Sequence, residues 1–149
     1  MSTRPTLLSL ILALAWLGAP MGAAAQSDVA AKAAAEPGAV VTPSGLVYRS
    51  LKDGSGASPQ ASDTVRVHYR GTFPDGKEFD SSYKRGQTAT FPLNRVIPCW
   101  TEGVAKMKEG GKAKLTCPPG IAYGARGAGA AVPPNATLNF EVELVKVMR

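Results

Sequence analysis

The segment TVRVHYRGTFPDGKEFDSS, residues 64–82, has the pattern of two antiparallel strands joined by a tight turn. Its first part is rich in β-branched and aromatic residues that alternate with polar ones, and Gly71 closes this run. The pair Asp75-Gly76 then reverses the chain into a second strand at residues 78–80. The segment therefore predicts a β-hairpin.

Similar alternation on both sides of this hairpin predicts further strands. The expected ranges are 45–51, 112–117 and 138–146, with a short additional strand over 88–91. In 112–117 and 138–146 apolar residues occupy every second position, which is typical of antiparallel strands with one face buried and one face in water. We expect about five strands in total.

One helix of about three turns is predicted to begin at Pro98, because proline suits the first helical position. Its apolar residues recur at helical spacing, and Gly110-Gly111 supplies its end. A single helix can bury its apolar face only against a sheet. We therefore expect an α+β domain in which an antiparallel sheet of about five strands packs on one short helix.

Composition indicates one globular domain and excludes several kinds of active site. The chain has 149 residues, of which 44% are hydrophobic and 19% charged. His68 is its only histidine and falls inside a strand pattern, which argues against a multi-histidine metal site and against a Ser-His-Asp triad. Two cysteines cannot form a four-thiolate zinc site. We expect no metal and no cofactor.

Charge does not identify a partner. The formal net charge is +6, but the 17 lysine and arginine residues are scattered. The lysines at 106, 108, 112 and 114 lie on either side of a helix end, without interleaved aromatic residues, so we interpret them as a solvated face and expect no nucleic-acid partner. The glycines of residues 124–129 lack the strand, helix and lysine of a phosphate loop.

The first residues have the form of a secretory signal. Arg4 is followed by the apolar run Leu7 to Gly18 and then by the small residues Ala23 to Ala25. The run is shorter than the roughly 20 residues of a membrane-spanning helix. We therefore expect a signal peptide over 1–25, an alanine-rich leader over 26–42 that is mobile or a short helix, and the folded domain over 43–149. The processed protein would be periplasmic or secreted, without a stable membrane span.

Cys99 and Cys117 form an even pair in a chain expected to enter an oxidising compartment, so they are candidates for one disulfide. The alternative is two buried free thiols that act as small hydrophobic side chains.

Six aromatic residues stand out among the expected strands and the helix. They allow two interpretations: a plain hydrophobic core, or a concave apolar pocket that also contains hydroxyl groups and the Asp80 carboxylate. Such a pocket would bind an apolar ring together with an amide carbonyl. The six residues are Tyr69, Phe79, Phe91, Trp100, Tyr123 and Phe140.

From about Thr42 to Met148 the sequence resembles the FKBP, or macrolide-binding, class of peptidyl-prolyl cis/trans isomerases. Six motifs carry the resemblance, in family order: VHYRG at 67–71, DGKEFDSS at 75–82, VIPCW at 96–100, GGKAKL at 110–115, IAYG at 121–124 and VPPNATL at 132–138. The resemblance implies a sheet wrapped around the helix, a pocket between them, and isomerisation of prolyl bonds without covalent chemistry.

Motif by motif, the resemblance implies a pocket lined by Tyr69, Phe79, Asp80, Val96, Ile97, Trp100, Tyr123 and Phe140. In that pocket the indole of Trp100 would form the floor, and Phe79 and Phe140 would form walls around a prolyl ring. The backbone N–H of Ile97 and the hydroxyl of Tyr123 would donate hydrogen bonds to substrate carbonyls.

Asp80, from this set, and two residues beside the set also receive roles from the resemblance. Asp80 would orient polar groups, either a tyrosine hydroxyl or Arg85, and Val132 would belong to the loop over the site.

Several positions depart from the fullest family pattern. Ala89 stands where the family often has a further pocket aromatic, and Ala128 and Ala131 replace bulkier loop residues, so we expect an open rim and weaker macrolide binding. Cys99 stands where glycine is common and Cys117 where an aliphatic residue is common, which favours the disulfide.

The expected partners are proline-containing polypeptides and, through the family, macrolide inhibitors. Some exported relatives have a long helical dimerisation arm before the domain. The leader of this chain is too short to form such an arm, so we expect a monomer. The alternative function is a chaperone or peptide-binding module with incidental isomerase activity.

Overall fold

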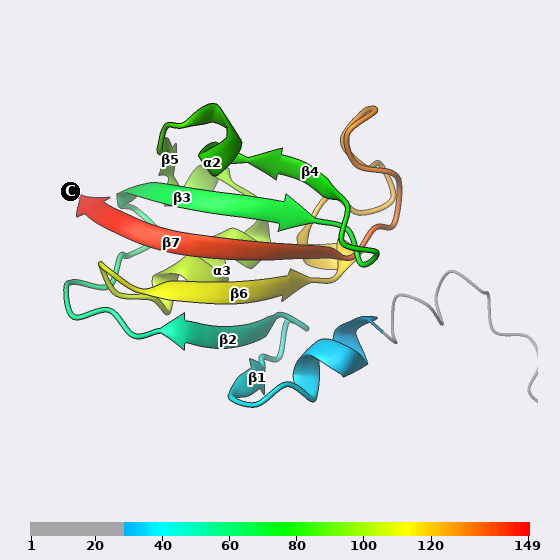
Figure 1. The fold of residues 1–149 in the computed structure, drawn as a ribbon, viewed down its shortest axis with the longest axis horizontal. Helices are drawn as coiled ribbons and strands as arrows, with labels where there is room; N and C mark the ends of the chain where they lie inside the picture. The colour runs from blue at the N-terminus through cyan, green and yellow to red at the C-terminus, as the bar shows by residue number, and fades with distance from the viewer. Residues whose placement is uncertain (1–28) are drawn as a thin grey trace, which may run out of the picture.

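The computed structural model describes residues 29–149 as an antiparallel sheet wrapped around a short helix (Figure 1). The strand order is β1-β2-β6-β7-β3-β4, and β5 pairs with β3 beside β4. The strands are β1 (Ala39–Val41), β2 (Val47–Lys52), β3 (Thr64–Thr72), β4 (Glu78–Ser81), β5 (Ala89–Pro92), β6 (Lys112–Cys117) and β7 (Leu138–Met148). The predicted fold class is confirmed, although the sheet has seven strands rather than about five.

Strict alternation along the central strands places the core on one face of the sheet. In β3 the side chains of Val65, Val67 and Tyr69 point inward, while those of Arg66 and Arg70 face water. β7 runs antiparallel beside β3 and buries every second residue from Leu138 to Leu144 in the same way. These two strands come from distant parts of the chain, so their pairing closes the sheet over a common core.

The core helix α3 (Pro98–Ala105) lies against the inner face, behind β7 and β6 in the view of Figure 1. It is shorter than the three turns predicted. Its last residues close in a tight turn, with the N–H of Lys106 donating to Gly103, and Met107 stays buried although it lies beyond the helix end. Gly103 allows the close approach to β6, because a Cβ there would lie 2.8 Å from the nearest Leu115 side-chain atom.

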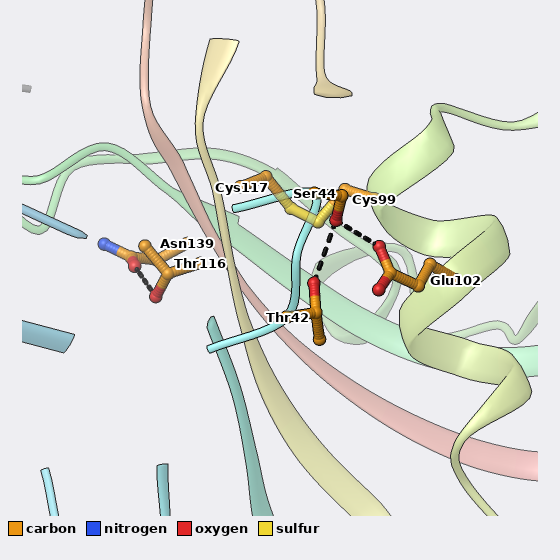
Figure 2. The surroundings of a disulfide bond; sticks show 7 residues. All are labelled: Thr42, Ser44, Cys99, Glu102, Thr116, Cys117 and Asn139. Atoms are coloured by element: carbon orange, nitrogen blue, oxygen red, sulfur yellow. Dashed lines mark hydrogen bonds between the residues drawn. A yellow bond between two sulfur atoms is a disulfide. The ribbon is translucent and has the colours of Figure 1, made fainter. Parts of the chain in front are cut away.

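The disulfide between Cys99 and Cys117 is present, as predicted, with 5.8 Å between the two Cα atoms. Figure 2 shows the bond between the start of α3 and the end of β6, beside a chain of hydrogen bonds from Thr42 through Ser44 to Glu102. Both cysteine side chains are fully buried. The disulfide therefore ties the helix to the sheet inside the core.

His68 has the structural role expected for a sheet residue. Its ring stacks on that of Tyr83 with 4.6 Å between centroids, and its Nδ1 lies 2.9 Å from the hydroxyl of Ser82. It is remote from the aromatic residues of the core face, because it points to the opposite side of β3.

The residues before β2 belong partly to the folded unit. Residues 29–34 are helical, and Glu36 beside them forms ion pairs with Arg49 and Lys114 at 3.1 and 2.8 Å. β1, which falls within the segment expected to be the leader, pairs with β2. The expected signal peptide lies outside the described residues. Within residues 29–149 no helix is long and apolar enough to cross a membrane.

Candidate active site

A cavity of about 440 Å³ opens between α3 and the concave face of the sheet. Strands, the start of α3 and the loop before β7 all contribute to its walls, so the complete fold is needed to build it. The lining residues are Tyr69, Phe79, Asp80, Phe91, Arg95, Val96, Ile97, Trp100, Tyr123 and Phe140.

Trp100 forms the floor of this cavity. Its indole meets three other rings nearly at right angles, with centroid distances of 5.2 Å to Tyr69, 5.6 Å to Phe91 and 5.4 Å to Phe140. Edge-to-face contacts of this kind hold aromatic side chains in fixed orientations. Pro98 starts the helix two residues earlier, so the indole comes from the first turn of α3. Within the described residues the buried indole N–H has no hydrogen-bond partner.

One wall carries a network of three polar groups around Asp80. The hydroxyl of Tyr69 donates to one carboxylate oxygen at 2.5 Å, and the guanidinium of Arg85 donates to the other at 2.7 Å. Arg85 also donates to the Tyr69 oxygen at 3.0 Å. The local sequence explains why Arg85 meets Asp80. Ser81 ends β4 and caps α2 (Ser82–Arg85), and this single helical turn brings the arginine back over the carboxylate.

This network fixes the charges at neutral pH. Partial burial alone would raise the pKa of Asp80, but the hydrogen bonds from Tyr69 and Arg85 outweigh it, and the net pKa is lowered. Burial, followed by the hydrogen bond to Asp80, raises the pKa of Tyr69. Hydrogen bonds to Tyr69 and Asp80 raise the pKa of Arg85. The carboxylate is therefore ionised while the phenol stays a hydrogen-bond donor.

Tyr123 reaches the cavity from the loop that follows η2 (Pro119–Ile121). The loop is fastened on both sides of the tyrosine, since Gly124 donates to Pro119 at 2.9 Å and accepts from Asn135 at 2.8 Å. Burial, then the charge of Asp80, raises the pKa of Tyr123. Its side chain is 39% exposed, and within residues 29–149 no hydrogen bond of its hydroxyl is found. A ligand entering the cavity would meet this phenol as a donor.

The structure brings together eight of the residues that the sequence placed in the pocket, and it leaves two outside the lining. Arg85 contacts the pocket only through Asp80 and Tyr69. Val132 is 3% exposed, because its loop folds back on Ala128 and turns the side chain into the core. The eight are Tyr69, Phe79, Asp80, Val96, Ile97, Trp100, Tyr123 and Phe140.

Two lining residues were missed. Phe91 belongs to the aromatic set, but the family motifs give it no site role, and Arg95 lies in none of these motifs. The two-residue alternation of β5 could have indicated Phe91. This residue lies two positions after Ala89, on the same face of the strand, and it pairs with Val65 of β3. The additional ring beside Trp100 is thus supplied by residue 91, while Ala89 does not line the cavity. No sequence pattern marks Arg95.

The sequence profile of the FKBP-type peptidyl-prolyl cis-trans isomerases matches residues 56–145. The chain belongs to this family. FkpA from Escherichia coli strain K12, an FKBP-type peptidyl-prolyl cis-trans isomerase, is 52% identical over 116 residues, which are 78% of this chain and 43% of that protein. This FKBP-type chain therefore spans less than half the length of that relative.

Solved structures of the FKBP-type family agree with the fold. The crystal structure of FkpA from Escherichia coli superposes with a TM-score of 0.82 at 48% identity, covering 85% of this chain and 59% of that one. A peptidyl-prolyl cis-trans isomerase from Pseudomonas syringae pv. tomato superposes with a TM-score of 0.80 at 38% identity, covering 90% of this chain and all of that one.

Proposed function

We propose that this chain catalyses cis/trans isomerisation of the peptide bonds that precede proline in exported polypeptides. The observation that carries the proposal is a single cavity that joins an aromatic floor, Trp100, to a phenol donor, Tyr123, whose hydroxyl has no hydrogen-bond partner among residues 29–149. Membership of the FKBP-type family supports the same reaction.

The reaction requires no bond to break, which explains why no nucleophile is needed. Rotation about the C–N bond must give up amide resonance, and in water the barrier is about 18–20 kcal/mol. The twisted amide is less polarised than the planar one, so an apolar cavity that excludes water disfavours the planar form relative to the transition state. A cavity walled by phenyl and indole rings has this property.

The side chains have complementary roles in the proposed reaction. The prolyl ring rests on Trp100 between Phe79 and Phe140, whose rings meet each other edge to face at 5.7 Å. The hydroxyl of Tyr123 and the backbone N–H of Ile97 hold carbonyl groups of the client on either side of the rotating bond. These contacts keep the chain in place while the amide turns.

Asp80 acts on the proposed reaction through its neighbours. Its carboxylate fixes Tyr69, whose ring packs on Trp100, and its negative charge adds to the effect of burial in raising the pKa of Tyr123. Arg85 balances this charge at the edge of the cavity. Asp80 and Arg85 are therefore positioning residues. Val132 anchors the loop over the site by packing into the core.

We propose further that the protein works outside the cytoplasm as a monomer. The sequence of residues 1–25 and the disulfide both favour an oxidising compartment. Macrolides that fill the prolyl cavity would inhibit it. Ala128 and Ala131 give the nearby loop small side chains, which offer few contacts to such large rings and therefore favour weak binding.

The test is the refolding of a client whose slow phase is limited by proline isomerisation, with and without the protein. The proposal predicts a faster slow phase at substoichiometric protein, and a smaller acceleration for Tyr123→Phe. Circular dichroism should show that the variant remains folded. An unchanged slow phase with folded wild-type protein would refute the activity, and improved yield without a faster phase would favour the peptide-binding alternative.

A further inference from the structure

A second cavity of about 630 Å³ shares the ring of Phe79 with the cavity above Trp100, which we call the prolyl cavity. The turn between β3 and β4 forms one of its sides, with Phe73 and Lys77, and the loop of residues 129–134 forms the other. We call this cavity the outer groove. Of the residues that line the outer groove, Phe79 is the one with a role in the proposed reaction.

The ring of Phe79 is a shared wall between the two cavities. On one side it packs on Phe73 with 4.9 Å between centroids, and on the other it meets Phe140 edge to face at 5.7 Å. Gly71 leaves room for this arrangement, because a Cβ at that position would lie 2.6 Å from Cζ of Phe79. The ring is thus packed between Phe73 and Phe140, and it lines both the outer groove and the prolyl cavity.

One extended peptide can therefore enter both cavities. A strand advances about 3.3 Å for each residue, so two residues span about 7 Å, enough to pass the edge of one phenyl ring. The first client side chain able to reach the outer groove is the one two positions from the proline, and the residue adjacent to the proline stays within the prolyl cavity.

The walls of the outer groove select for apolar side chains. Two phenyl rings, Phe73 and Phe79, face a loop segment of small residues and prolines that has no charged side chain between 129 and 134. Lys77 and Glu78 stand at the rim, and Glu78 already binds Arg70 at 2.7 Å. Ala130 and Ala131 contribute only methyl groups to the wall of this 630 Å³ cavity.

We propose that the outer groove is a second subsite, which binds an apolar, preferably aromatic, side chain of the client at least two residues from the proline. The proposal rests on the isomerase function, because the client reaches the groove from the prolyl cavity. Its continuity with that cavity through Phe79 favours the client chain over any separate partner.

The test uses blocked peptides with one Leu-Pro bond in a background of alanine and glycine. A single phenylalanine is placed at each position from the second to the fourth on either side of the proline, and kcat/KM is compared with that of the peptide without phenylalanine. We expect one position to raise kcat/KM about fivefold through a lower KM, the gain that a partly buried phenyl ring supplies. A ratio near one at every position would overturn the proposal.

Two variants assign that gain to the groove. Ala130→Trp fills it and Phe73→Ala removes one of its walls, and each should return the ratio to about one. The matched control is Ala125→Trp, an exposed position in the same loop that lines neither cavity, and it should keep the fivefold ratio. A ratio that persists in Ala130→Trp would contradict the proposal.

Failure of the isomerase function can be told apart from failure of the subsite. If no peptide is isomerised, the proposed function falls, and the dissociation constants of the same peptides, measured by calorimetry, still test the groove. Equal constants across the series would overturn the subsite. Sedimentation of the wild type as a dimer and of Ala130→Trp as a monomer would instead identify the groove as a contact between copies and refute the client proposal.

Discussion

Removal of the Cys99–Cys117 disulfide, by the paired substitutions Cys99→Ala and Cys117→Val, should destabilise the domain strongly. The bond joins the second residue of α3 to the last residue of β6, 18 positions apart, and both cysteines are fully buried. The start of α3 has no side-chain cap, because Ile97 makes no capping bond, and its first turn has no acidic residue. An isolated helix of eight residues is not stable in water.

The size of the effect follows from the loop that the disulfide closes. A cross-link between residues separated by 18 positions lowers the entropy of the unfolded chain, which corresponds to about 3 kcal/mol of stability at room temperature. In a domain of this size each kcal/mol shifts the Tm by about 4 °C. The paired substitution should therefore lower the Tm by about 12 °C.

Differential scanning calorimetry of both proteins, with and without a reducing agent, measures this change. The reducing agent should lower the Tm of the wild type toward that of the variant, and it should leave the variant unchanged. A Tm difference below about 3 °C would refute the reasoning, because the cross-link would then restrain little of the unfolded chain. A reductant effect on the variant would show that the loss has another cause.

Three further predictions concern the pocket. Tyr69→Phe removes the donor to Asp80 and should lower kcat/KM about tenfold in a peptide isomerisation assay; a change below about twofold would contradict the role of the network. Folding lowers the pKa of Asp80, so its contribution to stability is complete above its unfolded pKa and is lost as the pH falls through the folded pKa. Chemical denaturation should show that the free energies of unfolding of wild type and Asp80→Asn differ by a constant amount from about pH 5 to pH 8 and by less below about pH 4. A difference that grows on acidification would contradict this prediction. Gly71→Ala should displace the ring of Phe79, costing about 1–3 kcal/mol of stability in urea denaturation and most of the activity, whereas unchanged activity would show that this ring is not needed.

The strands with strict two-residue alternation could be predicted closely from the sequence. β6 spans the predicted residues 112–117, and β7 begins at the predicted Leu138. β3 continues past Gly71, which was expected to end it, because this glycine makes room for aromatic rings inside the sheet instead of starting a turn. Local patterning determined these elements, and the exception has a tertiary cause.

Other elements depend on contacts that the local sequence does not encode. β1 has only three residues and forms a strand through its partner β2. The turn of α2 is fixed by the Ser81 cap and by the ion pair that Arg85 forms with Asp80. The pocket residues found through family motifs line one cavity, except Arg85 and Val132, which are not part of its lining. Arg95 was missed because a cavity joins residues by position in space and not by any repeat along the chain.

The most direct test of the account measures exchange between the cis and trans forms of a Leu-Pro peptide by NMR at equilibrium. With substoichiometric wild-type protein we predict exchange cross-peaks that are absent from the peptide alone, because uncatalysed isomerisation takes tens of seconds or longer. Trp100→Leu, if folded by circular dichroism, should weaken these cross-peaks strongly. Folded wild-type protein that produces no exchange, or a Trp100→Leu variant as active as the wild type, would contradict the claim that this aromatic cavity turns the prolyl bond.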